Sequence, residues 1–232
     1  MLKLLNPGLF TKMPIKLVLS LLVITVCLFA FGLYQSLIAS PVDYQQGEMV
    51  RVMYVHVPAA WMSLGIYIFI AICSFCNLVW KTKMSYILAI AAAPVGTCFA
   101  LITLVTGSLW GKPIWGTWWV WDARLTSMLV LFLLYLSYMA VASSGNSISR
   151  AERPASVVAL IGLVNIPIVK FSVDIWYSLH QPASILRSGG PSIHNSMLIP
   201  LLVMFVSFIF YFIVILILRT TVVINKVKST AT

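Results

Sequence analysis

The sequence has 232 residues, of which 61% are apolar and only 9% charged, and its formal net charge is +10. Soluble domains carry about 25% charged residues, so this composition excludes a soluble protein and predicts a polytopic membrane protein. Because a spanning helix needs about 20 apolar residues, six spans fill the chain and leave no room for a second, soluble domain. We therefore expect an all-α fold and a single membrane domain over residues 1–232.

The apolar runs define six expected transmembrane helices. The first is too long for the apolar core of a signal peptide, so we interpret it as a span. Pro58 suits the first turn of the second helix, where no intrahelical partner for its nitrogen is needed. Pro94 is a candidate kink in the third. The expected spans cover approximately residues 17–38, 57–80, 86–109, 125–142, 154–177 and 196–218.

The basic residues are distributed unequally between the two ends of these spans. Four residues lie in the loops of one side: Arg51, Lys112, Arg124 and Arg187. Ten lie on the side of the two termini: Lys3, Lys12, Lys16, Lys81, Lys83, Arg150, Arg153, Arg219, Lys226 and Lys228. Because positive residues favour the cytoplasmic side, we expect both termini to be cytoplasmic. The net positive charge is thereby assigned to membrane topology and lipid, and not to nucleic-acid binding.

A tryptophan-rich stretch over residues 110–124 faces outside in this topology. It holds five of the eight tryptophans of the chain: Trp110, Trp115, Trp118, Trp119 and Trp121. Gly111, Pro113 and Gly116 predict a loop there and not a regular helix. An aromatic belt is one interpretation, since Trp favours the headgroup level. The density of rings, with Asp122 and Arg124 directly after them, favours a binding platform. Asp122 also suits the N-cap of the next helix, and Arg124 could snorkel.

All three histidines are expected on this outer side. His56 precedes Pro58, His180 follows the fifth span and His194 begins the sixth. Neutral imidazole is a common iron ligand, so His56 and His180 could be axial ligands of haem between Trp rings. Basic side chains such as Arg124 could meet the propionates. The alternative is that each histidine is merely solvated, and His194 also suits a cap.

Other chemistry is sparse in this sequence. Lys170 lies inside the fifth span, where a charge indicates function unless it snorkels outward. Cys73 and Cys76 form a C-x-x-C pair inside an apolar helix, where structural cysteines are expected. We find no paired carboxylates, no Ser–His arrangement and no Gly-rich phosphate loop. The sequence therefore assigns no catalytic residue, and any ATP use is expected to belong to a partner.

The run from Trp115 to Thr126, W-G-T-W-W-V-W-D-A-R-L-T, resembles the WWD signature of haem-handling proteins in cytochrome c assembly. The stretches 53–61, 167–174 and 178–184 resemble the cytochrome c maturation protein C (CcmC) family, over nearly the whole chain. The resemblance implies axial ligands at His56 and His180 and a haem motif over Trp115 to Asp122. Ile175 departs from the pattern, since the family often has a second Trp there.

The resemblance also implies the function and the partners. Haem b would be held at the outer face of a bacterial or mitochondrial inner membrane and delivered to the haem chaperone CcmE. CcmD and the ATP-binding cassette pair CcmA and CcmB are the further expected partners. Two alternatives stay open. An electron-transfer subunit with b-type haem usually places its histidines within the spans, and a solute permease should show polar or broken helices near the midplane.

Overall fold

The computed structural model describes residues 7–144, 148–181, 184–185 and 189–229, and this part of the chain is helical without a strand. Six helical segments are long and apolar enough to cross a membrane, which confirms the predicted all-α fold with six spans. Two segments carry short extensions of other helix types: a π-helical turn follows α2, and a 3₁₀ turn precedes α3. The helices are α1 Pro7–Thr11, α2 Ile15–Tyr34 with η2 Gln35–Ala39, η3 Glu48–Val52, α3 Met53–Trp80, α4 Lys83–Trp115, α5 Ala123–Ser143, α6 Ile148–Gly162, α7 Asn165–Ile175 and α8 Asn195–Ser229.

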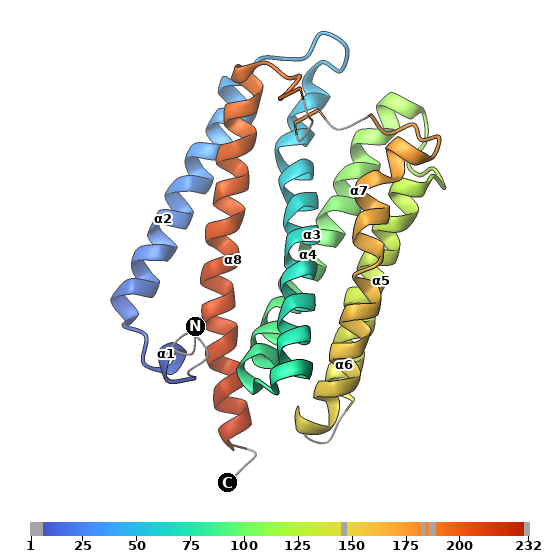
Figure 1. Ribbon diagram of the computed structural model, residues 1–232. Coiled ribbons are helices and arrows are strands. Elements are labelled where there is room, and N and C mark those ends of the chain that lie inside the picture. Colours follow the sequence, from blue (N-terminus) through green and yellow to red (C-terminus); the bar gives the residue numbers. More distant parts are fainter. Residues whose placement is uncertain (1–6, 145–147, 182–183, 186–188, 230–232) are drawn as a thin grey trace.

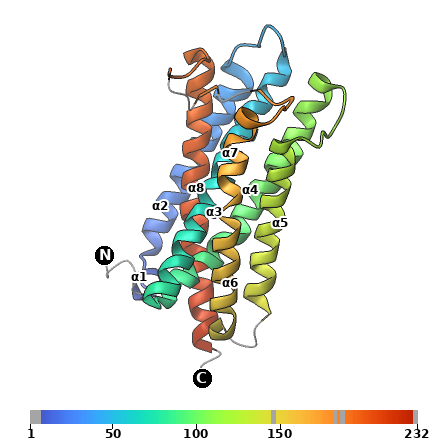
Figure 2. The same ribbon diagram turned by 45° about the vertical axis from the view of Figure 1, so that its right-hand side comes forward.

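The helices form a bundle in which α3 and α4 are central (Figure 1). On one side α8 packs against this pair and carries α2 on its outer face. On the other side α5 packs against α4, with α6 and α7 beside it (Figures 1 and 2). Large apolar side chains such as Val23 and Val26 of α2 are exposed, as expected where a helix faces lipid.

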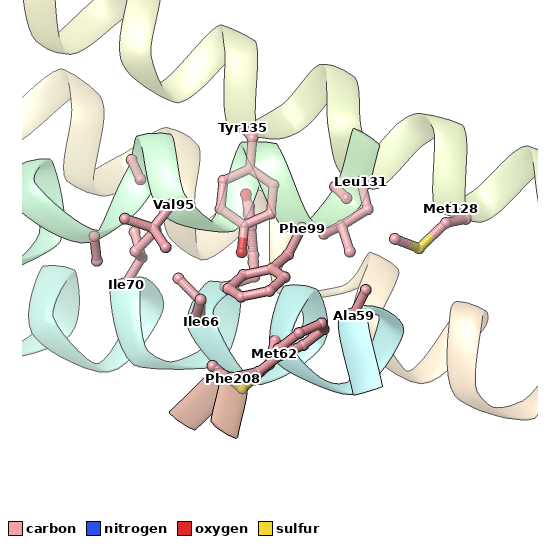
Figure 3. Close-up of a cluster of buried hydrophobic side chains, with 14 of the residues drawn as sticks. Ala59, Met62, Ile66, Ile70, Val95, Phe99, Met128, Leu131, Tyr135 and Phe208 are labelled. Carbon is pink, nitrogen blue, oxygen red and sulfur yellow. The ribbon is translucent and has the colours of Figure 1, made fainter. Parts of the chain in front are cut away.

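The core lies where α3, α4, α5 and α8 meet, and Figure 3 shows its apolar side chains. Tyr135 of α5 is fully buried there, and its hydroxyl donates a hydrogen bond of 2.7 Å to the carbonyl oxygen of Ser63. Gly96 of α4 makes room for this ring, since a Cβ at that position would lie 2.3 Å from the Tyr135 hydroxyl. The close packing fixes α3 and α4 against α5.

Helix α1 and the last turn of α8 lie at one end of the bundle (Figure 1). The other end gathers the start of α3, the end of α4, the start of α5, the end of α7 and the start of α8 (Figures 1 and 2). Lys3 and Arg187 of the basic-residue count lie outside the described residues. The side of the membrane that each end faces stays a prediction.

Helix α4 extends further than the sequence predicts, so the expected loop over residues 110–124 is wrong in its first part. The helix continues through Gly111 and Pro113 to Trp115. The Trp115 ring lies on Gly111, where a Cβ would approach its Cε3 atom to 2.6 Å. Gly116 then ends the helix in the left-handed conformation at φ 76°, and its N–H bonds the Lys112 carbonyl oxygen at 3.0 Å. The irregular segment is therefore only residues 116–122.

Two other spans also differ from expectation. Helix α3 begins at Met53 and not at residue 57. His56 therefore lies inside the helix and not before it, and Pro58 lies beyond the first turn. The fifth span is broken between α6 and α7, at Leu163 and Val164. Pro167 has no N–H for the Leu163 carbonyl oxygen, which instead accepts from the N–H of Ile166 at 3.1 Å. The remaining spans extend the expected ranges by some residues at their ends, α8 most of all, to Ser229.

Candidate functional site

Two of the three histidines lie beside each other at the end of the bundle opposite α1 (Figure 1). His56 is the fourth residue of α3, and His180 belongs to the segment that follows α7. The centres of the two imidazole rings are 6.5 Å apart, with 35° between the ring planes. The structure thus brings together the two side chains that the sequence predicts to be a ligand pair.

The tautomer of His56 follows from its neighbour on α4. Nδ1 of His56 lies 3.1 Å from Oγ1 of Thr106, whose own hydroxyl proton goes to the Ile102 carbonyl oxygen at 2.6 Å. The Thr106 oxygen therefore accepts, and Nδ1 of His56 donates. This leaves the lone pair of Nε2 free to bind a metal, the arrangement typical of metal-binding histidines. Gly107 admits the ring closely, since a Cβ there would lie 3.1 Å from Cε1 of His56.

His180 is held in the same way by a different acceptor. Its Nδ1 lies 2.9 Å from the carbonyl oxygen of Gln181, which can only accept, so Nδ1 donates and Nε2 keeps its lone pair. Burial lowers the pKa of His180 below its ordinary value of 6.5, and the charge of Arg124 adds to this effect. The hydrogen bond to Gln181 and the charge of Asp122 act in the opposite direction. A lowered pKa favours the neutral imidazole, which is the form that binds metals.

His194 differs from these two histidines. Its Nδ1 accepts a hydrogen bond of 3.3 Å from the backbone N–H of Ser196, at the start of α8. In a neutral ring the proton is then on Nε2, so that nitrogen has no free lone pair. The side chain is exposed and serves the helix start, which agrees with leaving His194 out of the predicted pair.

Asp122 connects the tryptophan-rich segment to His180. One carboxylate oxygen accepts a hydrogen bond of 2.8 Å from the backbone N–H of Leu125 and so caps α5, as the sequence predicts. The other accepts from the hydroxyl of Ser178. The Ser178 oxygen in turn accepts a hydrogen bond of 3.0 Å from the backbone N–H of His180. The start of α5 and the His180 segment are therefore fixed to each other.

The helical tryptophans contact the histidine pair. The Trp110 ring meets His56 edge to face, with 5.6 Å between ring centres, and the Trp115 ring lies 6.4 Å from His180. Nε1 of Trp110 donates a hydrogen bond of 2.8 Å to the side-chain oxygen of Gln46. Gln46 belongs to a turn that Asp43 stabilises by accepting from two backbone N–H groups. The segment between η2 and η3 therefore positions Trp110.

The other three tryptophans lie apart from the pair. Nζ of Lys112 lies 5.8 Å from the centre of the Trp118 ring, and the centres of the Trp119 and Trp121 rings are 5.5 Å apart. Within the described residues, no ring contact joins any of these three to His56 or His180. Nε1 of Trp119 is buried and, in the same part of the chain, has no hydrogen-bond partner. The single platform expected from five rings is thus divided into two groups.

Arg124 joins α5 to α7. Its Nε donates a hydrogen bond of 2.9 Å to the Ser172 hydroxyl, and its Nη2 one of 3.4 Å to the Lys170 carbonyl oxygen. The charge of Arg124 acts on both imidazoles of the pair. The Lys170 side chain is exposed, so Lys170 contributes to this arrangement only through its backbone.

The sequence did not single out four residues that shape the pair: Thr106, Gly107, Gln46 and Ser178. Thr103, Thr106, Gly107 and Trp110 recur at helical spacing, so they form one small and polar face on an otherwise apolar helix. From this small and polar face, the contact of α4 with α3 could have been predicted from the sequence. Gln46 and Ser178 lie in irregular segments, where the sequence gives no comparable periodicity.

Comparisons with known proteins agree on one family. The family model described as CcmC, heme exporter protein C, matches residues 1–232. The heme exporter protein C of Bradyrhizobium diazoefficiens is 48% identical over 90% of this chain and 79% of its own length. That of Haemophilus influenzae is 43% identical over 80% of this chain and 76% of its own length.

A mitochondrial relative extends this similarity beyond bacteria. The cytochrome c biosynthesis CcmC-like mitochondrial protein of Marchantia polymorpha is 50% identical over 79% of this chain and 77% of its own length. The six spans and these relatives show that the chain is a multi-pass inner-membrane protein. The relatives also support a role in haem export or delivery for cytochrome c biogenesis. The chain belongs to the heme exporter protein C (CcmC) family.

Proposed function

We propose that this chain binds haem iron through His56 and His180 and presents the haem to a membrane-tethered chaperone. The proposal rests on the hydrogen bonds and the tautomers of the two imidazole rings. Each donates from Nδ1 to a protein oxygen and so keeps its Nε2 lone pair free, and the ring centres are 6.5 Å apart. Haem is the cargo in this account, and the two side chains hold it for transfer.

The separation of the rings fits one iron atom. If both Nε2 atoms point at one iron, two bonds as long as zinc–imidazole bonds, about 2.0–2.1 Å each, and the two nitrogen-to-centre distances put the ring centres about 6 Å apart. The rings of Trp110 and Trp115 offer aromatic contact to a porphyrin beside the ligands. Arg124, whose charge already acts on both imidazoles, is the proposed partner of the propionates. The unpartnered Nε1 of Trp119 is a further donor for an anionic group.

The transfer step needs an acceptor outside this chain. We find no obvious catalytic nucleophile in the sequence, so we propose that the covalent bond forms on a histidine of the chaperone CcmE, with haem b as the group transferred. Trp121 is 76% exposed and lies beside Trp119, so these rings are the proposed docking surface for the chaperone. CcmD and the ATP-binding cassette subunits CcmA and CcmB are the proposed further partners.

The proposed orientation follows from the basic residues. Their excess on the side of the termini favours cytoplasmic termini, and we propose that the histidine pair faces outside. Residues 1–232 then act as one six-helix unit, with residues 110–124 as its haem-handling part.

The two alternatives fit the structure less well. In an electron-transfer subunit both histidines would lie on spanning helices, whereas His180 follows the end of α7. A permease is favoured by the break between α6 and α7. However, the polar side chain at that break, Asn165, already donates a hydrogen bond of 2.9 Å to the Ser127 carbonyl oxygen.

Haem retention by histidine variants tests the proposal. We expect His56→Ala and His180→Ala each to lower strongly the haem that co-purifies, because each change removes one iron ligand. His194→Ala is the matched control and should retain the wild-type amount. The measurement is haem per protein by pyridine haemochrome, with the size-exclusion profile as a folding control. Wild-type haem content in both ligand variants would contradict the proposal.

A further inference from the structure

A shallow apolar groove lies on the face of α4 away from the histidine pair. It is lined by Leu104, Val105, Ser108 and Leu109 of α4 and by the Trp118 ring, and its volume is about 310 Å³. Such a volume is at the lower end of the range for ligand pockets, about 300–1,000 Å³. About half of the Val105, Leu109 and Trp118 surfaces is exposed, so the groove is open along this face of the bundle.

The groove and the residues that contact His56 lie on opposite faces of α4. Residues 104, 105, 108 and 109 recur at a spacing that keeps them on one face. At 3.6 residues per turn, Thr106 and Gly107, which contact His56, lie about half a turn away. The groove therefore lies on the other side of α4 from His56, although Trp118 of the haem-handling stretch lines it.

The side chain of Lys112 lies at the end of the groove, next to the Trp118 ring. Lys112 follows Ser108 by one turn, so it continues the same face to the end of α4, about 12 Å from Leu104 along the axis. Its Nζ lies 5.8 Å from the centre of the Trp118 ring and donates a hydrogen bond of 3.0 Å to the Gly116 carbonyl oxygen. An ammonium group has three donors, so two remain for a ligand.

We propose that this groove binds an anionic phospholipid, with one acyl chain along the groove and the phosphate at Lys112. The apolar walls suit a hydrocarbon chain, and Lys112 lies in the last turn of the spanning helix α4, where its ammonium group can meet a lipid phosphate. A spanning helix of a partner fits less well, because helix–helix contacts in membranes favour small residues. Here only Ser108 is small, and the other lining residues are large. The bound lipid would brace Trp118 and hence the segment after Gly116.

Native mass spectrometry of the purified full chain with added phosphatidylglycerol or phosphatidylcholine tests the proposal. We expect phosphatidylglycerol to be retained in preference, and Lys112→Gln to weaken this retention about fivefold, the effect of one basic residue near an anionic surface. Lys112→Arg should keep the retention, because the charge is preserved. Lys170→Gln, which removes an exposed cation of α7, is the matched control and should not change it. Equal retention of the two lipids would overturn the proposal.

A second variant tests the groove itself. Ser108→Phe fills the groove but keeps Lys112, so it should also reduce phosphatidylglycerol retention, with the size-exclusion profile as the folding control. A photoreactive amino acid at position 105 then identifies the occupant in native membranes. An adduct of phospholipid mass supports the proposal. A crosslink to another protein chain instead, or unchanged retention in both Ser108→Phe and Lys112→Gln, would overturn it.

Discussion

The Asp122 carboxylate accepts a hydrogen bond from the hydroxyl of Ser178, so the start of α5 is joined to the segment that carries His180. Because the Ser178 oxygen also accepts from the backbone N–H of His180, the orientation of that histidine depends on Asp122. The same carboxylate caps α5 through the N–H of Leu125. One aspartate therefore has two separable effects, on the helix and on the proposed ligand.

Ser178→Ala should weaken haem binding without disturbing α5. The change removes the connection to His180 but leaves the cap at Leu125 intact. Loss of groups that orient a metal ligand typically costs about 10–100-fold in metal affinity, and we expect a loss in this range. Haem titration of the purified apoprotein measures it. Ser178→Thr keeps the hydroxyl and should bind as wild type; equal affinity of the Ala and Thr variants would show that the connection does not matter.

Asp122→Asn and Asp122→Ala separate the two effects of the aspartate. Asn is a good N-cap residue, so only the Ala variant should lose stability, by about 1 kcal/mol. Both variants should bind haem less well, because the charged acceptor for Ser178 is lost. Thermal unfolding and haem titration on the same samples measure the two effects. If haem affinity followed stability alone, so that the Asn variant bound as wild type, the aspartate would act only as a cap.

Thr106→Val should weaken haem binding through His56. Without the hydroxyl, Nδ1 of His56 loses its acceptor and the free Nε2 is no longer favoured. The expected loss of affinity is again about 10–100-fold. Thr106→Ser retains the acceptor and should bind nearly as the wild type does. The assignment of the His56 tautomer would be wrong if the Val and Ser variants bound haem equally.

The sequence predicted the features that depend on local chemistry. Asp122 was identified as an N-cap because the residue type and its position before an apolar run suffice for that prediction. His56 and His180 were expected on the same side because the number of spans between them fixes the side on which they lie. Both predictions needed no knowledge of packing.

The features that the sequence missed depend on contacts between helices. Gly111 and Pro113 indicated a loop, yet α4 continues because the Trp115 ring covers Gly111 and only Gly116 takes a left-handed conformation. The support of His56 by Thr106 requires the register of α3 against α4, which spacing along one helix does not give. The division of the tryptophans into two groups likewise depends on contacts between segments, which the sequence does not give.

This division predicts two different phenotypes for tryptophan variants. Trp115→Leu should lower haem retention, because the ring beside His180 is lost. The combined Trp118, Trp119 and Trp121→Leu variant should keep haem through the histidines but fail to load the chaperone. Misplacement of reacting groups by about 1 Å can cost about a hundredfold in rate. Haem content of this protein and haem staining of CcmE from the same cells measure the two properties. Normal loading of CcmE in the triple variant would leave these rings as an aromatic belt.

The proposed topology predicts which positions are accessible from outside. Thr117 follows the end of α4, Arg150 lies in the first turn of α6, and both are exposed. The end of α4 and the start of α6 lie at opposite ends of the bundle (Figure 1). In a background without Cys27, Cys73, Cys76 and Cys98, a cysteine at position 117 should react with a membrane-impermeant reagent applied to the periplasmic side. A cysteine at 150 should react only after the membrane is permeabilised. The reverse pattern would place the histidine pair in the cytoplasm, away from the proposed chaperone.

The coordination state of bound iron shows whether His56 and His180 are its two protein ligands. Ferric haem bound to the wild-type chain should be six-coordinate and low-spin, with two imidazole ligands, in its electron paramagnetic resonance spectrum. His56→Ala and His180→Ala should each abolish this signal, and His194→Ala should leave it unchanged. A high-spin, five-coordinate signal from the wild-type protein, or a bis-imidazole signal that survives in both ligand variants, would contradict the assignment of His56 and His180 as the axial pair.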